Sequence, residues 1–282
     1  MERLNPLNDF LFFKVMGEKG DEEQLLGFLN AVLGRGGERR AVSVEILGNK
    51  TFSAGVIGDK TSILDVRAVL GDGSRVNVEV QLRNLGNMDR RSLFYWSREY
   101  TRSLEAGQDY QELPNVAAIN IVNFNFLPQG DFHTVFHLWE DGDRTLLLTD
   151  ALEIHFLDMV KFRAAAEKDI RNEPLHRWLV WFDQGSPAEL VEEVVRMDGA
   201  IKKAEERTVY VSHDKEALRA YEMRQLALSD WTSGVNHARR EGRLEGKLEE
   251  RLAIARSALA QGFTLEDVHR ITGLDPDTLK TL

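Results

Sequence analysis

The spacing of apolar residues changes several times along the chain, and each change predicts a different kind of element. Residues 8–33 have helical spacing with a break at Gly17–Gly20, which predicts two helices, the first capped by Asn8 or Asp9 and the second ended by Gly34. From about residue 41 the period becomes two, as expected of strands. The predicted strands are 42–47, 63–70, 75–82, 116–126, 132–139 and 152–159, with a helix at 88–106 between the third and the fourth.

The second half of the chain has helical spacing throughout. Beyond about residue 162 no further strand is predicted, and helices are expected over 174–182, 187–207 and 213–261, followed by two short helices in 263–282. Within the long helix, Leu244, Leu248 and Leu252 recur on one stripe, while Gly242 and Gly246 each cost about 1 kcal/mol relative to Ala. Such a helix needs packing or self-association to be stable.

Composition narrows the class of protein. The 282 residues are 43% hydrophobic, enough for a large core, and no apolar run approaches the length of a membrane span. The first residues lack the layout of a signal peptide, and cysteine is absent, which fits a reducing cytoplasm. The formal charge is −10, from 36 basic and 46 acidic residues, so any binding of nucleic acid must use a local basic patch.

Residues 64–82, LDVRAVLGDGSRVNVEVQL, form the most informative segment. A loop of two residues would place Asp65 among valines. A loop of three, Gly71–Gly73, with the last glycine at positive φ, places Asp65 opposite Glu79 and Arg67 opposite Asn77. We prefer the second register because it separates polar from apolar side chains. The apolar face would then hold Val66, Ala68, Leu70, Val76 and Val78.

Two carboxylates directly opposite each other on neighbouring strands destabilise a hairpin unless something offsets their charge. Arg67 and Arg75 offer one solution, a solvated face with neutralised acids, and spacing alone favours it. A divalent cation offers another, since Mg²⁺ takes one or two carboxylates together with waters and phosphate oxygens. Gln81, two residues after Glu79, would point at the same place.

Asp65 followed by Glu79-Val80-Gln81 resembles the core of the PD-(D/E)XK nuclease superfamily, and more closely the Rpn family of recombination-promoting nucleases, also described as transposases. The similarity extends to NPLNDFLFFKVMG (5–17), to DRRSLFYWSREYTRSLEAGQDYQELPNVAAINIVNF (89–124) and to EIHFLDMVKF (153–162). The chain departs from the family pattern at Phe13, Met16 and Asp158. This ordered set of segments favours the metal over the solvated hairpin.

The resemblance implies a restriction-endonuclease-like α/β core, a mixed sheet flanked by helices, followed by a helical C-terminal extension. It divides the chain into a nuclease-like domain (1–185), a helical extension (186–235) and a repeat helix with a helix-turn-helix-like tail (236–282). It implies a DNA endonuclease, linked to recombination, that hydrolyses phosphodiester bonds with Mg²⁺ or another divalent cation such as Mn²⁺ or Ca²⁺. The implied catalytic residues are Asp65, Glu79 and Gln81, and the implied metal ligands are Asp65, Glu79 and the carbonyl of Val80.

Other residues remain open to two interpretations. On the helix 88–106, Leu93, Trp96, Tyr100 and Leu104 share one face, and the opposite face is either solvated or a DNA-binding stripe. That stripe consists of Arg91, Tyr95, Arg98 and Arg102. Asp9 is either a further acid of the site or a helix cap, the commoner role.

Three histidines and one further pair complete the candidates. His133 and His137 share a strand face with His155 nearby, but zinc needs better-placed partners, and exposed histidines are the commoner case. Asp158 and Lys161 would extend the polar site or form a salt bridge.

Two alternative functions follow from other features of the chain. The neutral Gln81 would suit a catalytically weak or inactive protein that binds DNA as a scaffold. The leucine stripe and the tail, which has more acidic than basic side chains, would suit a protein-interaction or homo-oligomerisation module.

Overall fold

The computed structural model describes residues 3–20, 22–47, 65–105 and 107–282; positions 63, 64 and 106 of the predicted elements lie outside this part. The chain divides into two compact units, Met1–Arg224 and Gln225–Leu282. No helix of the described residues has both the length and the apolar character needed to cross a membrane.

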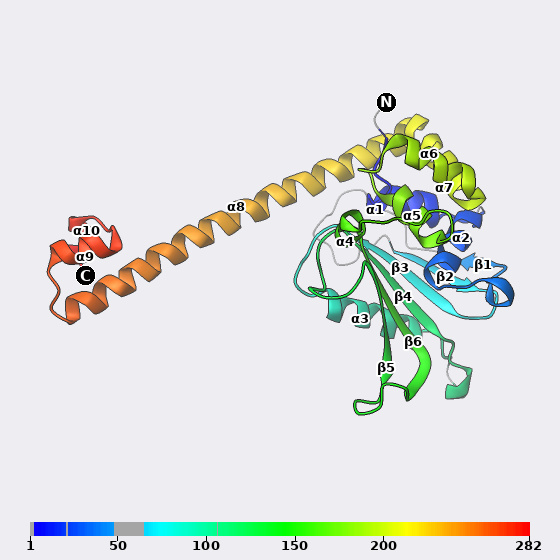
Figure 1. Cartoon of the computed structure of the whole chain (residues 1–282), viewed down its shortest axis with the longest axis horizontal. Helices are drawn as coiled ribbons and strands as arrows, with labels where there is room; N and C mark the ends of the chain where they lie inside the picture. Colours follow the sequence, from blue (N-terminus) through cyan, green and yellow to red (C-terminus); the bar gives the residue numbers. More distant parts are fainter. Residues whose placement is uncertain (1–2, 21, 48–64, 106) are drawn as a thin grey trace. The chain divides into compact units, whose positions relative to one another are not determined.

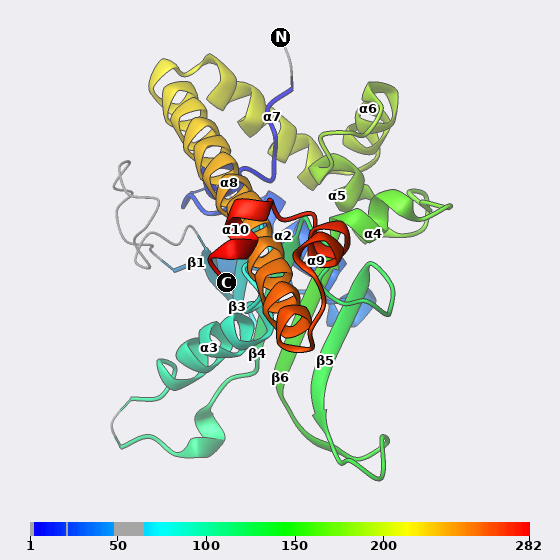
Figure 2. The same cartoon turned by 90° about the vertical axis from the view of Figure 1, so that its left-hand side faces the viewer.

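The first unit is built on a mixed six-stranded sheet with the order β1-β2-β3-β4-β6-β5 (Figure 1). β3 and β4 are parallel, as are β4 and β6, while the other neighbours are antiparallel. The strands are β1 (Val44–Ile46), β2 (Val66–Leu70), β3 (Arg75–Gln81), β4 (Val116–Val122), β5 (His133–Trp139) and β6 (Leu147–Asp158). β5 and β6 form a long hairpin that extends past the other strands, as both views show (Figure 2).

Helices cover both faces of the sheet (Figure 1). α3 (Met88–Thr101) lies on one face, where Met88 packs with Ala118, Ile154 and Phe156. The other face carries the main core, to which α1 (Asp9–Met16), α2 (Glu23–Val32), α5 (Pro174–Phe182), α6 (Ala188–Met197) and α7 (Gly199–His213) all contribute buried side chains. Because helices cover both faces, every residue of the central strand β4 is buried, as its apolar sequence predicted.

Most predicted elements are confirmed, with differences at two junctions. The predicted helix 187–207 is wrong, because it is broken at Asp198, whose side chain accepts hydrogen bonds from the N–H groups of Ala200 and Ile201 and caps α7. A short helix after β6, α4 (Met159–Ala164), was not predicted; it is capped by Asp158 in the same way. Both caps follow from the preference of helix N-termini for an acceptor side chain. Two 3₁₀ turns, η1 (Gly37–Arg39) and η2 (Tyr110–Glu112), complete the unit.

The long helix α8 (Lys215–Ala260) begins in the first unit and continues through the second, where α9 (Leu265–Thr272) and α10 (Pro276–Lys280) follow. Thr264 caps α9 and Gly273, at φ +66°, ends it, as predicted. The second unit has a small core of its own, formed by Ala255, Val268, Leu274 and Leu279 with Leu252 against them. The predicted α/β class, with a mixed sheet flanked by helices and a helical C-terminal extension, is confirmed.

Candidate active site

The β2–β3 hairpin has the register predicted from its sequence. Arg67 pairs with Asn77 and Val66 with Val78, so the position before β2, Asp65, is level with Glu79. The loop comprises three residues, because the N–H of Leu70 donates to the carbonyl of Ser74 at 2.8 Å across it. Gly73 adopts φ +87°, the conformation that such a loop requires in its last position.

This register sorts the hairpin's side chains as expected. Val66, Ala68, Leu70, Val76 and Val78 are all buried in the main core. Side chains alternate along a strand, so Asp65 and Glu79 lie on the opposite face of the sheet, the face covered by α3. The burial of the apolar face, rather than an attraction between the acids, therefore holds the two carboxylates together.

Glu79 is a buried carboxylate with an unequal environment at its two oxygens. Glu79 is only 3% exposed. Its Oε1 accepts a hydrogen bond from Arg91 Nε at 2.7 Å, and Arg91 Nη2 lies 2.5 Å from the same oxygen. Oε2 is also buried and accepts no hydrogen bond from any described residue. Burial raises the pKa of Glu79, and the hydrogen bond from Arg91 partly offsets that effect.

Asp65 experiences the same low-dielectric surroundings. The pKa of its carboxyl is raised to about 6, mainly by burial and also by the negative charge of Glu79, while a backbone hydrogen bond and the charge of Arg67 oppose the rise. The charge of Glu79 therefore disfavours the ionised form of Asp65, so the two acids are electrostatically coupled. A pair of coupled, desolvated carboxylates in one place is typical of functional sites.

The residues present fit a divalent cation that takes only some of its ligands from the protein. Among the described residues no group of three or more His, Asp or Glu side chains could hold a metal, so the site offers two carboxylates. That donor set suits Mg²⁺, which keeps several waters and takes phosphate oxygens from a substrate. The orphaned Oε2 of Glu79 is the observation that a cation would explain. Val80 buries its side chain in the core, which leaves its carbonyl as the group for the predicted ligand role.

Gln81, the last residue of β3, lies on the same side of its strand as Glu79 and is half-buried. Its Nε2 donates a long hydrogen bond of 3.4 Å to the carbonyl of Arg83. A bond of that length holds the amide only weakly. The amide can accept and donate hydrogen bonds but supplies no charge.

Helix α3 is fixed over the acids by polar contacts, and its buried side differs from the predicted one. Ser92 Oγ donates to Asn120 Oδ1 at 3.0 Å, and Trp96 Nε1 donates to the carbonyl of Val116. Leu93, predicted to face the sheet with Trp96, is 51% exposed. The buried residues are instead Met88, Ser92 and Glu99, because the face of the sheet beneath α3 carries polar side chains that Ser92 and Glu99 can bind.

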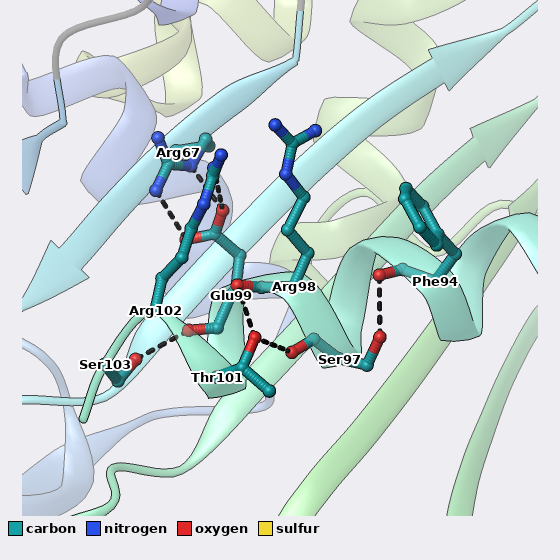
Figure 3. A network of polar contacts seen from close by, with 8 residues as sticks. All are labelled: Arg67, Phe94, Ser97, Arg98, Glu99, Thr101, Arg102 and Ser103. Atoms are coloured by element: carbon teal, nitrogen blue, oxygen red, sulfur yellow. Dashed lines mark hydrogen bonds and ion pairs between the residues drawn. The ribbon is translucent and has the colours of Figure 1, made fainter. Parts of the chain in front are cut away.

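The four residues of the predicted DNA-binding stripe have different environments. Arg91 points at Glu79, and its guanidinium lies 5.1 Å from the centre of the Tyr95 ring. The prediction that Arg91 lies on the side of α3 away from the sheet is therefore wrong. Arg98 is exposed and, among the described residues, forms no ion pair, and Figure 3 shows its guanidinium separate from the neighbouring network. Arg102 is exposed and lies 3.9 Å from Glu99.

A second ion pair, which was not among the sequence predictions, links the hairpin to α3. Arg67 Nε and Nη2 donate to the two carboxylate oxygens of Glu99 at 2.5 and 2.8 Å (Figure 3). In the solvated-hairpin interpretation, Arg67 and Arg75 neutralise the two acids of the hairpin. In the structure Arg67 pairs with Glu99 instead, and the arginine that binds Glu79 is Arg91. The signal that could have identified Glu99 is its place seven residues after Ser92, on the same side of the helix.

Asp9 is bound by another partner. Arg224 Nε donates to Asp9 Oδ1 and Oδ2 at 2.8 and 3.0 Å, and Arg224 Nη2 also contacts Oδ2. Asn8, not Asp9, is the main cap of α1, since its side chain accepts from the N–H groups of Phe10 and Leu11. No contact between described residues joins Asp9 to Asp65 or Glu79.

The three histidines, Asp158 and Lys161 contact groups within the fold. His133 Nε2 lies 2.9 Å from His155 Nδ1, and His137 Nδ1 lies 3.2 Å from the carbonyl of Leu152. Asp158 caps α4, whereas the ammonium group of Lys161 donates to the carbonyls of the loop residues Gln129 and Gly130. Of the two alternatives left open for this pair, the salt bridge is not formed in the described part of the chain.

Comparison with known proteins agrees with this geometry. The family model described as PD-(D/E)XK nuclease family transposase matches residues 6–238, which include the hairpin, α3 and the helices that complete the core. Neither the curated proteins nor the solved structures gave a match. The family match spans most of the chain. The chain therefore belongs to the PD-(D/E)XK nuclease family of transposases.

Proposed function

We propose that the protein is a DNA endonuclease that uses Mg²⁺, or another divalent cation, to hydrolyse phosphodiester bonds in the course of DNA recombination. The observation that carries the proposal is the pairing of Asp65 with Glu79 on one sheet face, with a buried Glu79 oxygen that no described residue binds. Family membership gives the class of chemistry, and this pair gives a place for it.

Each residue of the site has a defined part in this proposal. The carboxylates of Asp65 and Glu79, with the carbonyl of Val80, would hold the cation, which supplies charge stabilisation and a more acidic bound water. Gln81 would orient the attacking water through its amide, since its last-strand position leaves the group half-exposed. The exposed Arg98 and Arg102 would contact phosphates of the DNA backbone, a local basic surface in an acidic chain.

A plasmid-nicking assay tests this proposal. The wild-type chain should nick supercoiled DNA with Mg²⁺, stop when EDTA is added and recover when Mg²⁺ is restored in excess. Asp65→Asn and Glu79→Gln should each abolish nicking. Asp72→Asn is the matched control, because Asp72 is an exposed acid of the same hairpin. Nicking that survives both active-site substitutions would contradict the assignment.

A second candidate function is self-association through α8, and a specific observation favours it. Leu244 and Leu248 are 67% and 49% exposed, whereas Leu252 of the same stripe packs against the small core of the second unit. Two exposed leucines one helical turn apart suit a helix–helix contact between copies. Light scattering of Leu244→Gln/Leu248→Gln against the wild-type chain tests this, and an unchanged mass would contradict it.

A further inference from the structure

The guanidinium of Arg91 holds Oε1 of the Glu79 carboxylate, the group that the proposed metal would bind, and leaves Oε2 without a partner among the described residues. Both of its contacts, from Nε at 2.7 Å and from Nη2 at 2.5 Å, go to the same oxygen, Glu79 Oε1. The Glu79 side chain is 4% exposed and that of Arg91 is 25% exposed, so the pair is largely shielded from water. Such a shielded pair is costly to break unless another cation replaces the lost partner.

The remainder of α3 holds Arg91 in this position. Tyr95, one turn later, lies with its ring 5.1 Å from the guanidinium. The neighbouring Ser92 is hydrogen-bonded to Asn120, which pairs with Glu79 in the adjacent strand. Arg91 therefore cannot move far with the helix and must leave Glu79 by rotation of its own side chain. Its partial exposure gives that side chain a route to solvent and to an anion bound there.

Two positive groups cannot both neutralise one carboxylate at full strength. A divalent cation that bound Asp65 and Oε2 of Glu79 would share the Glu79 carboxylate with the adjacent guanidinium and be repelled by its charge, and a cation that bound both Glu79 oxygens would have to displace Arg91 from Oε1. A DNA phosphate offers Arg91 an alternative anionic partner, with the bidentate geometry that guanidinium groups prefer.

We propose that Arg91 is a positioning residue that competes with the divalent cation for Glu79 and is drawn away by a DNA phosphate, so that DNA and metal strengthen each other's binding. The inference rests on the proposed function, because it takes Glu79 as a metal ligand. Its consequence is a site that binds metal weakly until substrate arrives. Binding linkage makes the effect reciprocal: the factor by which DNA tightens metal binding equals the factor by which metal tightens DNA binding.

Calorimetric titration of the full chain with Ca²⁺ at pH 8, without DNA, tests the competition. Arg91→Gln should bind Ca²⁺ at least about tenfold more tightly than the wild-type chain. The reason is that the variant lacks the charged hydrogen bond between Arg91 and Glu79, which stabilises the metal-free state of the wild-type chain. Arg90→Gln, an exposed arginine on the same helix, is the matched control and should leave the affinity unchanged. Equal or weaker Ca²⁺ binding by Arg91→Gln would overturn the proposal.

The same titration with a short DNA duplex tests the coupling, with a gel to verify that the duplex stays intact. DNA should tighten Ca²⁺ binding by the wild-type chain and have a much smaller effect on Arg91→Gln. An equal effect of DNA on both would overturn the role of the phosphate. If Arg91→Gln fails to fold by circular dichroism, Arg91→Lys serves instead: it keeps the charge but loses the two-nitrogen contact, and Ca²⁺ binding should still tighten.

Comparison of Glu79→Gln with Arg91→Gln separates this inference from the proposed function. Ca²⁺ binding that is insensitive to Glu79→Gln would overturn the competition, since the competed group would not be a ligand. Ca²⁺ binding that depends on Glu79 and tightens in Arg91→Gln supports the competition even where no nicking is seen, and in that case the nuclease proposal alone fails.

Discussion

Arg67 of the hairpin and Glu99 of helix α3 form a two-nitrogen, two-oxygen ion pair in which the Glu99 side chain is only 5% exposed. The pair joins the strand that follows Asp65 to the helix that carries Arg91. It therefore fixes the distance between the parts of the candidate active site that come from different elements. The hydrogen bond to Glu99 also raises the pKa of Arg67, so its guanidinium stays charged.

Removing one partner of this pair should be costly. Glu99→Ala is expected to lower the free energy of unfolding by about 3 kcal/mol, because it leaves the guanidinium of Arg67 partly buried without its partner. Urea unfolding followed by circular dichroism measures the change. The double variant Arg67→Met/Glu99→Leu should recover part of the loss. A single variant as stable as the wild-type chain would show that the pair does not hold the hairpin to α3.

The turn of the hairpin gives a second prediction. Gly73→Ala should destabilise the first unit by about 1–2 kcal/mol, because φ +87° is unfavourable for a residue with a Cβ atom. Gly246→Ala in α8 is the matched comparison: apart from the neighbouring backbone of the helix itself, no atom of the described residues lies within 4 Å of the added Cβ, and the helix should gain about 1 kcal/mol. Equal effects of the two substitutions in thermal unfolding would contradict the turn geometry.

The contact between α2 and α7 gives a third prediction. A Cβ atom on Gly27 would lie 2.4 Å from the Cβ of Ala200, a distance that the two helices cannot accommodate without moving apart. Gly27→Ala should therefore cost about 1–3 kcal/mol of stability. Gly27→Ala/Ala200→Gly should recover much of that loss, and a double variant no better than the single one would place the conflict elsewhere.

His133 gives a prediction for pH. Burial, with a contribution from His155, lowers the pKa of His133 from 6.5 to about 4. The unfolded chain therefore binds more protons at this residue between about pH 6.5 and pH 4, so its contribution to stability is present above that window and is lost as the pH falls through it. Urea unfolding of His133→Gln should show a weaker loss of stability over this range than the wild-type chain.

The control for this prediction is His237→Gln, since the side chain of His237 is 67% exposed in the second unit. That variant should keep the wild-type pH dependence. If His133→Gln and His237→Gln lose stability equally between pH 6.5 and pH 4, protonation of His133 does not contribute to acid unfolding.

The hairpin could be predicted from sequence because its determinants are local. Alternation of polar and apolar residues, together with one glycine that tolerates positive φ, admits a single register that buries the valines. The same local signals predict the break between α1 and α2 and the caps of the C-terminal helices. The Asp-Gly pair at 198–199 was a further local signal, a helix cap, that the prediction of one continuous helix overlooked.

The environment of α3 could not be predicted in this way. Hydrophobic periodicity pointed to Leu93 as a buried position. The sheet beneath the helix instead presents the buried polar side chains of Asn77, Glu79 and Asn120, and polar residues of α3 form better partners for these groups than a leucine would. Which arginine meets which acid depends on the rotation and height of the helix over the sheet. Those quantities are set by tertiary contacts such as Ser92 with Asn120, which join residues 28 positions apart.

The position of a bound cation tests the central claim most directly. Crystals of the full chain grown with a short DNA duplex and Mn²⁺ would locate the ion by anomalous diffraction. We expect the strongest peak between the carboxylates of Asp65 and Glu79, with the guanidinium of Arg91 turned from Glu79 towards a phosphate. A peak elsewhere, or an intact pair between Arg91 and Glu79 beside bound DNA and Mn²⁺, would contradict the account.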